Sequence, residues 1–137
     1  MKNMNEPSHT ASQASYRVPA LADIGHVHLK VSDLDRSLRF YRDLLGFQLM
    51  TLYGDQPAFI SAGGYHHHMG LNTWHSRGAP PAQRQGVGLY HVAIRYPTRK
   101  DLAIIFVRLR GAGYPFSGAS DHGVSEALYL NDPGNNG

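Results

Sequence analysis

Apolar and polar residues alternate along residues 24–31 (IGHVHLKV), a stretch rich in β-branched side chains. This pattern predicts a β-strand. A helix should follow directly, because apolar residues then recur at helical spacing until Gly46, where glycine favours the end of a helix. Ser32 or Asp33 can cap the first turn of this helix. Its apolar positions, which we expect to cover a sheet, are Leu34, Leu38, Tyr41 and Leu45.

Three short stretches with the character of strands come next, at residues 47–53, 58–62 and 66–74. Turn-forming Gly54-Asp55 and Gly63-Gly64 separate them. Together with the first strand and helix, they predict one βαβββ module over about residues 24–74.

The pattern restarts after a linker at residues 75–87, which is rich in Arg, Gly, Pro and Gln. Residues 89–96 (LYHVAIRY) predict a strand, and Thr98 with Asp101 resembles a capping box at the start of a helix that ends at Gly111. Strands are expected at 114–116 and 126–130, followed by a turn at 131–137. The second module, about residues 88–137, therefore lacks the counterpart of the last strand of the first.

An internal repeat supports this division. His26-Val27-His28-Leu29-Lys30 matches His91-Val92-Ala93-Ile94-Arg95 at a shift of 65 residues, and each copy leads into a capped helix. The sequence predicts an α+β fold of two paired βαβββ modules, in one domain over residues 20–137. Residues 1–19 are polar and lack a long apolar segment, which favours a flexible leader.

Composition narrows the possible partners. Lys and Arg are scattered, so a net charge of +3 does not indicate a nucleic-acid site. No stretch approaches the roughly 20 apolar residues of a membrane span. The absence of cysteine excludes disulfides and thiolate metal sites and is compatible with a reducing cytoplasm, where we expect the protein to reside. Nine histidines in 137 residues direct attention to metal binding and proton transfer.

Three groups of residues are candidates for chemistry. His26 and His91 occupy equivalent positions of the repeated strand and would face a shared cavity if the modules pair about a pseudo-twofold axis, which suits a metal. In His66-His67-His68, strand alternation would send His66 and His68 to one face and His67 to the other, and a neutral imidazole there could act as a general base. His122 and Tyr129 could donate hydrogen bonds to a metal-bound oxygen species.

At these residues the chain resembles the vicinal oxygen chelate superfamily, which includes glyoxalases, bleomycin resistance proteins and extradiol dioxygenases. The opening HVHLKVSDLDRSLRFY with Leu45-Gly46-Phe47 is similar to the module start of the superfamily, and residues 59–74 (FISAGGYHHHMGLNTW) are similar to the catechol 2,3-dioxygenase group. The resemblance implies an extradiol ring-cleaving dioxygenase that acts on a catechol-type aromatic diol with Fe(II), or alternatively Mn(II), and O₂.

The resemblance also implies residue roles. His26 and His91 become iron ligands, and His122 and Tyr129 hydrogen-bond donors to oxygenated intermediates. The active-site base corresponds to His67 by motif or to His68 by strand parity. The third iron ligand of the group, a Glu, is expected about two residues beyond Gly137.

Two other functions on the same scaffold stay open. One is a glyoxalase-like metalloenzyme that polarises a carbonyl compound, and the other is a metal-free binding protein of the antibiotic-sequestering type. The repeated histidines argue against the second. In each case we expect a homo-oligomer, because a sheet without its last strand exposes an edge that can pair with another chain.

Overall fold

The computed structural model describes residues 15–137. The expected leader at 1–19 therefore lies mostly outside the described residues. Residues 15–26 form no helix or strand and are exposed. Within the part of the chain that the structure describes, none of the helices has the length and apolar character needed to cross a membrane.

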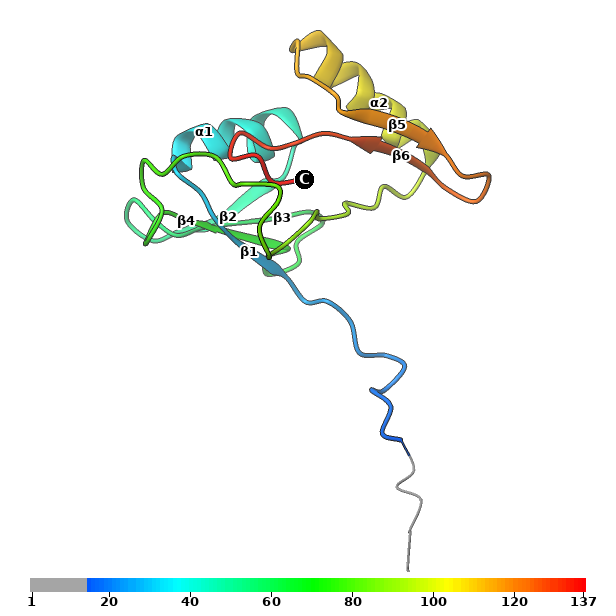
Figure 1. The fold of residues 1–137 in the computed structure, drawn as a ribbon, viewed down its shortest axis with the longest axis horizontal. Coiled ribbons are helices and arrows are strands. Elements are labelled where there is room, and N and C mark those ends of the chain that lie inside the picture. Colours follow the sequence, from blue (N-terminus) through cyan, green and yellow to red (C-terminus); the bar gives the residue numbers. More distant parts are fainter. Residues whose placement is uncertain (1–14) are drawn as a thin grey trace, which may run out of the picture.

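The first module forms a complete βαβββ unit, as predicted. Its sheet has the strand order β1-β4-β3-β2, in which β1 pairs parallel to β4 and the other pairs are antiparallel (Figure 1). The elements, in chain order, are β1 (Val27–Lys30), α1 (Leu34–Leu38), the π-helical turn η1 (Arg39–Leu44), β2 (Gln48–Leu52), β3 (Ala58–Ser61) and β4 (Met69–Asn72).

Local chemistry explains the start of the first helix. The Asp33 carboxylate accepts a hydrogen bond from the Arg36 backbone N–H at 2.9 Å, so Asp33 is the N-cap. Ser32, the alternative, instead accepts a hydrogen bond from the Arg36 guanidinium at 2.8 Å. The helix widens after Leu38, and the Leu45 N–H reaches back five residues to the Phe40 carbonyl at 2.9 Å.

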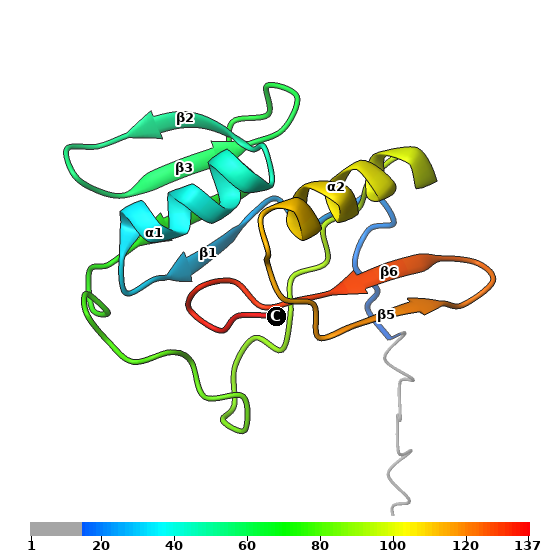
Figure 2. The ribbon, with the colours of Figure 1, turned by 90° about the horizontal axis from the view of Figure 1, so that it is seen from above.

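One face of the four-stranded sheet is buried against α1 and η1, which lie across it (Figure 2). On the other face, His28 is exposed and Phe59 is half-buried. The strand period of two separates these faces, and the outward one stays available for a ligand. The buried apolar residues of the first module are Leu29, Val31, Leu38, Phe40, Tyr41, Ala58, Ile60, Met69 and Leu71.

The second module consists of α2 (Arg99–Gly111), β5 (Gly118–Asp121) and β6 (Glu126–Tyr129). Thr98 is confirmed as the N-cap, because its hydroxyl accepts a hydrogen bond from the Asp101 N–H at 3.1 Å. The Asp101 carboxylate accepts from the same hydroxyl at 2.6 Å and not from the Thr98 backbone N–H, so the arrangement resembles a capping box without its second backbone bond. The antiparallel pair β5-β6 forms a separate two-stranded sheet beside α2 (Figure 2).

Two strand predictions in this module were wrong. Residues 89–96 form no strand, because a strand needs a partner, and among the described residues none occupies the place that β4 takes beside β1. The strand expected at 114–116 lies instead at Gly118–Asp121. Pro115 has no N–H to donate to a ladder, and the Phe116 ring packs against Phe106 with centroids 5.2 Å apart.

The modules meet through a few hydrogen bonds. Tyr41 donates its hydroxyl hydrogen to the buried Asp132 carboxylate at 2.8 Å, and the Arg108 guanidinium donates to the carbonyls of Asp43 and Leu44 at 3.0 Å each.

One backbone hydrogen bond occurs at the equivalent position of both modules. The Val92 N–H donates to the Gly137 carbonyl at 2.8 Å, just as the Val27 N–H donates to the His68 carbonyl at 3.1 Å in the first module. The repeat is thus preserved in backbone pairing at this one point.

Candidate functional site

Three histidines gather where β1 begins. The rings of His26 and His67 lie with their centroids 4.4 Å apart, and His66 is 6.3 Å from His26. His26 precedes β1, whereas His66 and His67 lie in the turn that precedes β4. Because β1 and β4 are parallel neighbours, the residues just before them fall at the same edge of the sheet. This histidine cluster (His26, His66 and His67) is therefore a direct product of the topology.

A hydrogen bond within the cluster constrains the protons. The Nδ1 atoms of His66 and His67 are 2.9 Å apart, so one of them must carry a hydrogen and the other must accept it. When His67 is the donor, its Nε2 has a free lone pair and can take a proton from a ligand. His66 then orients the His67 ring, as a partner of a catalytic imidazole does.

The surroundings of His67 also favour its neutral form. Partial burial, followed by the nearby imidazoles of His26, His66, His28 and His68, lowers its pKa below the ordinary value. A histidine that stays neutral at physiological pH keeps the lone pair that a general base needs.

His68 is engaged differently. Its Nδ1 accepts a hydrogen bond from the Ala62 backbone N–H at 3.2 Å and lies 3.0 Å from the Ser61 hydroxyl. An Nδ1 that accepts has no hydrogen, so a neutral His68 carries its proton on Nε2 and has no free lone pair. The predicted alternation of side chains between the two faces of a strand does not apply to residues 66–68, since β4 begins only at Met69.

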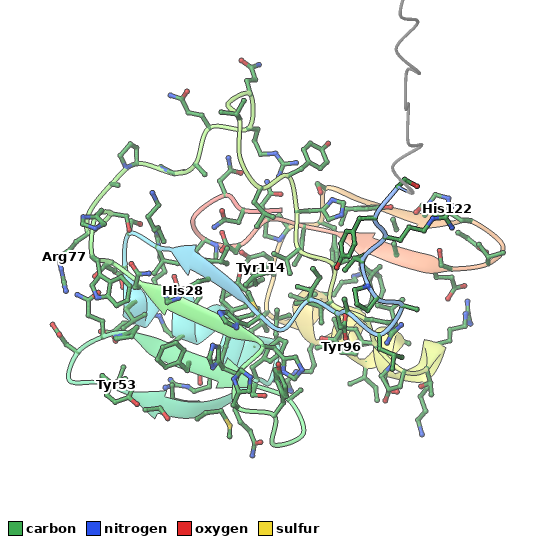
Figure 3. All side chains as sticks on the ribbon, turned by 90° about the horizontal axis from the view of Figure 1, so that it is seen from below. His28, Tyr53, Arg77, Tyr96, Tyr114 and His122 are labelled. Atoms are coloured by element: carbon green, nitrogen blue, oxygen red, sulfur yellow. The ribbon has the colours of Figure 1, made fainter. Side chains whose placement is uncertain are left out.

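An aromatic face continues from the cluster across the sheet; we use this term for Tyr53, Phe59, His28 and Trp74. The Phe59 ring lies 4.6 Å from His67, 5.9 Å from His28 and 6.1 Å from Tyr53, centroid to centroid. His28 in turn lies 5.6 Å from Trp74. Figure 3 shows His28 on the β1 and β4 side of the sheet and Tyr53 towards its β2 side.

Gly70 makes room for the His28 ring. The two residues are paired in the parallel register of β1 and β4, and a Cβ on Gly70 would lie 2.9 to 3.0 Å from three atoms of that ring. Any larger residue at position 70 would displace the imidazole. Burial, and then the charge of His26, lowers the His28 pKa.

His91 lies elsewhere. Its ring neighbours Tyr90, with centroids 5.6 Å apart, and within residues 15–137 no ring pair joins it to His26. His91 borders a cavity of about 670 Å³ between the two modules, which is also lined by Tyr41, Met69, Leu109 and Gly137. The last residue of the chain is therefore next to the second histidine of the repeat.

His122 and Tyr129 are brought together through a residue that the sequence did not single out for a role. The Ser120 hydroxyl lies 2.9 Å from His122 Nε2 and 3.3 Å from the Tyr129 hydroxyl, so it bridges the two. They lie on the β5-β6 hairpin, and Figure 3 shows His122 at the end of the molecule opposite the first sheet.

A metal fits the described residues only in part. His26 and His91 are suitable nitrogen donors, but among residues 15–137 no three His, Asp or Glu side chains form a group that could hold a metal ion. The donor set expected for a facial triad is thus incomplete among these residues.

Sequence reasoning named His66 in a candidate group but did not predict its hydrogen bond to His67, and it missed His28 and Ser120 as members of these arrangements. The alternation His26-Val27-His28 was the available signal for His28, since it puts both imidazoles on one face of a strand. The contacts of Ser120 and His66 could not be predicted this way, because they depend on the hairpin register and on the conformation of a turn.

Comparison with known proteins gives the family. The model of the Glyoxalase/Bleomycin resistance protein/Dioxygenase superfamily matches residues 23–137. The chain is 46% identical over 92 residues to a catechol-2,3-dioxygenase of Bacillus subtilis (strain 168), a match that covers 66% of this chain and 32% of that protein. It is 30% identical over 115 residues to biphenyl-2,3-diol 1,2-dioxygenase 3 of Rhodococcus globerulus, covering 82% and 59%. The chain thus spans about a third and three fifths of these relatives.

Solved structures agree on the fold. A glyoxylase/bleomycin resistance protein/dioxygenase domain from Frankia sp. EAN1pec superposes with a TM-score of 0.66 at 26% identity, covering 85% of this chain and 87% of that one. Lactoylglutathione lyase from Agrobacterium tumefaciens gives 0.64 at 20% identity, covering 88% and 91%, a likeness of fold alone. From the family match over residues 23–137 and the superposition on the Frankia domain, we conclude that this chain belongs to the glyoxalase/bleomycin resistance protein/dioxygenase superfamily.

Proposed function

We propose that this chain carries the diol-binding face of an extradiol ring-cleaving dioxygenase, which acts on a catechol-type aromatic with O₂. The observation that carries the proposal is the contact of His67 with His26 at the edge of an aromatic face. It occurs in a chain that shares 46% identity over 92 residues with a catechol-2,3-dioxygenase. An aromatic diol suits this surface, because Phe59 and Trp74 offer rings for edge or face contacts while His67 offers a proton acceptor.

We assign the role of base to His67 rather than His68. His67 Nε2 is free to accept a proton from a diol hydroxyl when Nδ1 donates to His66, whereas Nδ1 of His68 is already engaged by the Ala62 N–H. Transfer of that proton to His67 leaves the diol oxygen as an anion, which is a better nucleophile than the neutral hydroxyl. The Phe59 ring, 4.6 Å from His67, limits access of water on one side of the imidazole.

Fe(II), with Mn(II) as the alternative, is the metal that this proposal implies. The family resemblance makes His26 and His91 the candidate ligands, although in the part of the chain described His26 lies in the histidine cluster and His91 borders the cavity between the modules. These two imidazoles do not form a complete donor set with a third residue in the part of the chain described. His122 and Tyr129 are assigned no step, because they lie on the β5-β6 hairpin, apart from His67.

The test is aerobic ring cleavage. Protein supplied with Fe(II), and separately with Mn(II), should convert catechol to the yellow ring-opened product, and a chelator should abolish the reaction. His67→Gln should lower kcat by about 10²- to 10⁴-fold with little change in KM, because general-base catalysis contributes a factor of this size. Absence of ring-opened product with either metal would contradict the proposal.

Two matched histidine variants serve as controls. His75→Gln removes an exposed imidazole outside the cluster and should leave kcat unchanged. His68→Gln should lower stability through loss of the Ala62 and Ser61 contacts, with a much smaller effect on kcat than His67→Gln. If His68→Gln lowered kcat more than His67→Gln, the assignment of the base would be reversed.

A further inference from the structure

The position of His28 points to a role in substrate choice. We propose that His28 is a specificity-determining residue whose ring contacts the substituent on the aromatic diol, selecting a small uncharged group such as methyl. This inference rests on the proposed function, since it takes the diol end of the substrate to lie at His67. It concerns a side chain that has no part in the proton transfer described above.

The first support is the packing around the His28 ring. The imidazole lies over Gly70, where an added Cβ would come within 2.9 to 3.0 Å of Nδ1, Cδ2 and Cε1. Phe59 and Trp74 flank it with interplanar angles of 72° and 47°. A ring held from below and on two sides keeps one orientation, which discrimination between similar substrates requires.

The second support is the path from His67 to His28. Both rings contact Phe59, at 4.6 and 5.9 Å, so a flat molecule that reaches His67 extends over Phe59 towards His28. His28 lies two residues beyond His26 on one strand face, a spacing of about 6.5 Å. That spacing suits a benzene ring whose hydroxyls face His26 and His67 and whose far carbon faces His28.

The surroundings decide the kind of substituent. Phe59 and Trp74 present aromatic carbon next to His28, and a methyl group in contact with these rings gains the free energy of the apolar surface that it covers. A carboxylate in the same place would lose part of its water, and Lys30, two residues beyond His28 on the same face, is exposed and offers only a solvent-screened ion pair. An uncharged substituent para to one hydroxyl is therefore preferred.

The test compares kcat/KM for 4-methylcatechol, catechol and 4-tert-butylcatechol. In the unaltered protein we expect 4-methylcatechol to be favoured over catechol by about three- to fivefold, the value of one buried methyl group. His28→Ala should abolish this preference and improve 4-tert-butylcatechol relative to catechol, because the vacated volume accepts the larger group. A merely structural role would lower all three values together.

Gly70 allows a double-mutant cycle. Gly70→Ala should push the His28 ring outwards and reduce 4-tert-butylcatechol turnover relative to catechol, and it should have no such effect in the His28→Ala background. Lys30→Ala is the matched control, because Lys30 is exposed on the same face of β1, two residues beyond His28. It should leave the three-substrate ratios unchanged.

Binding can be followed without turnover. Trp74 is the single tryptophan of the chain and lies 5.6 Å from the His28 ring, so its fluorescence reports on ligands at this face. In anaerobic titrations of the Fe(II)-supplied protein, 4-methylcatechol should quench Trp74 at lower concentration than catechol, and His28→Ala should remove the difference.

The outcomes separate the two proposals. If no diol is cleaved and none perturbs Trp74, the proposed function fails and the inference falls with it. If catechol is cleaved but His28→Ala leaves the substrate ratios and the titrations unaltered, the inference alone is overturned. Preference for a carboxylate-bearing diol, lost in Lys30→Ala, would likewise overturn it.

Discussion

The two modules carry the same pattern of elements and reach different degrees of order. The first contributes nine of the eleven buried apolar residues of the described chain, and the second contributes only Ile105 and Leu109. Both contain a helix with a side-chain cap at its start. The difference therefore lies in the sheets, since the first has four paired strands and the second only two.

The strand β4 explains this contrast. It lies between β1 and β3, pairs with both, and is buried at all four positions. In the second module the corresponding pairing is limited to the hydrogen bond between Val92 and Gly137, and residues 93–96 continue without a partner among those described. A central strand thus organises both its neighbours and the helix above them.

The largest expected effect tests that role of β4. Leu71 has no exposed surface and packs in the core of the first module. Leu71→Ala should cost about 2–5 kcal/mol, the sum of lost burial and a cavity, in urea unfolding followed by circular dichroism. Ile104→Ala, on the exposed side of α2, should change stability by no more than about 0.5 kcal/mol. Comparable losses in both variants would contradict the unequal division of the core.

A smaller effect is expected at the junction of the modules. Tyr41 donates to the buried Asp132 carboxylate, which also accepts hydrogen bonds from the backbone of Gly134 and from Asn136. Tyr41→Phe removes one donor to a charged buried acceptor and should cost about 1.5–3 kcal/mol in the same unfolding measurement. A loss well below this range would mean that the junction is open to water.

The pH dependence of stability provides an independent check. Burial, and then the charge and hydrogen bond of Asp132, raise the Tyr41 pKa far above 10, and burial raises the pKa of Tyr114 to about 12. A tyrosine with a raised pKa stabilises the fold below its unfolded pKa, and this contribution declines as pH rises through 10 towards the folded value. Stability should therefore fall above pH 10, and less steeply in Tyr41→Phe. An unchanged slope would contradict the buried Tyr41–Asp132 contact.

Sequence pattern was sufficient for the first module and for the helix of the second. The predicted strand at 58–62 agrees with Ala58–Ser61 to within one residue, because the turn-forming residues that bound the segment and its tertiary pairing favour the same limits. Residues 89–96 show an equally clear pattern, yet they form no strand. The pattern of apolar and polar residues indicates which segments are able to form a strand. A strand also requires a hydrogen-bonded partner strand, which can lie far away in the sequence.

The site shows the same limit. The repeat directed attention to His26 and predicted that it faces a shared cavity with His91. The structure instead places His26 beside His67, while His91 borders the cavity between the modules, whose lining among the described residues does not include His26. Strand parity could not separate His67 from His68, because both precede β4 and their contacts are set by a turn. The pairing of His28 with Gly70 follows from the register of two parallel strands, which no local pattern specifies.

The smallest predicted effect is the loss of a helix cap, and it tests whether the two modules unfold together. Asp33 and Thr98 both cap a helix by accepting a backbone N–H, so replacing either by Ala should cost about 1 kcal/mol. If the Tyr41 and Arg108 contacts make the modules one cooperative unit, both variants shift a single urea transition to the same extent, and the double variant shifts it by the sum. If Thr98→Ala shifts only an earlier transition that Asp33→Ala leaves in place, the second module unfolds first. The two-stranded sheet would then account for the lower stability of the second module. The first module, which contains the histidine cluster, would be an independent folding unit.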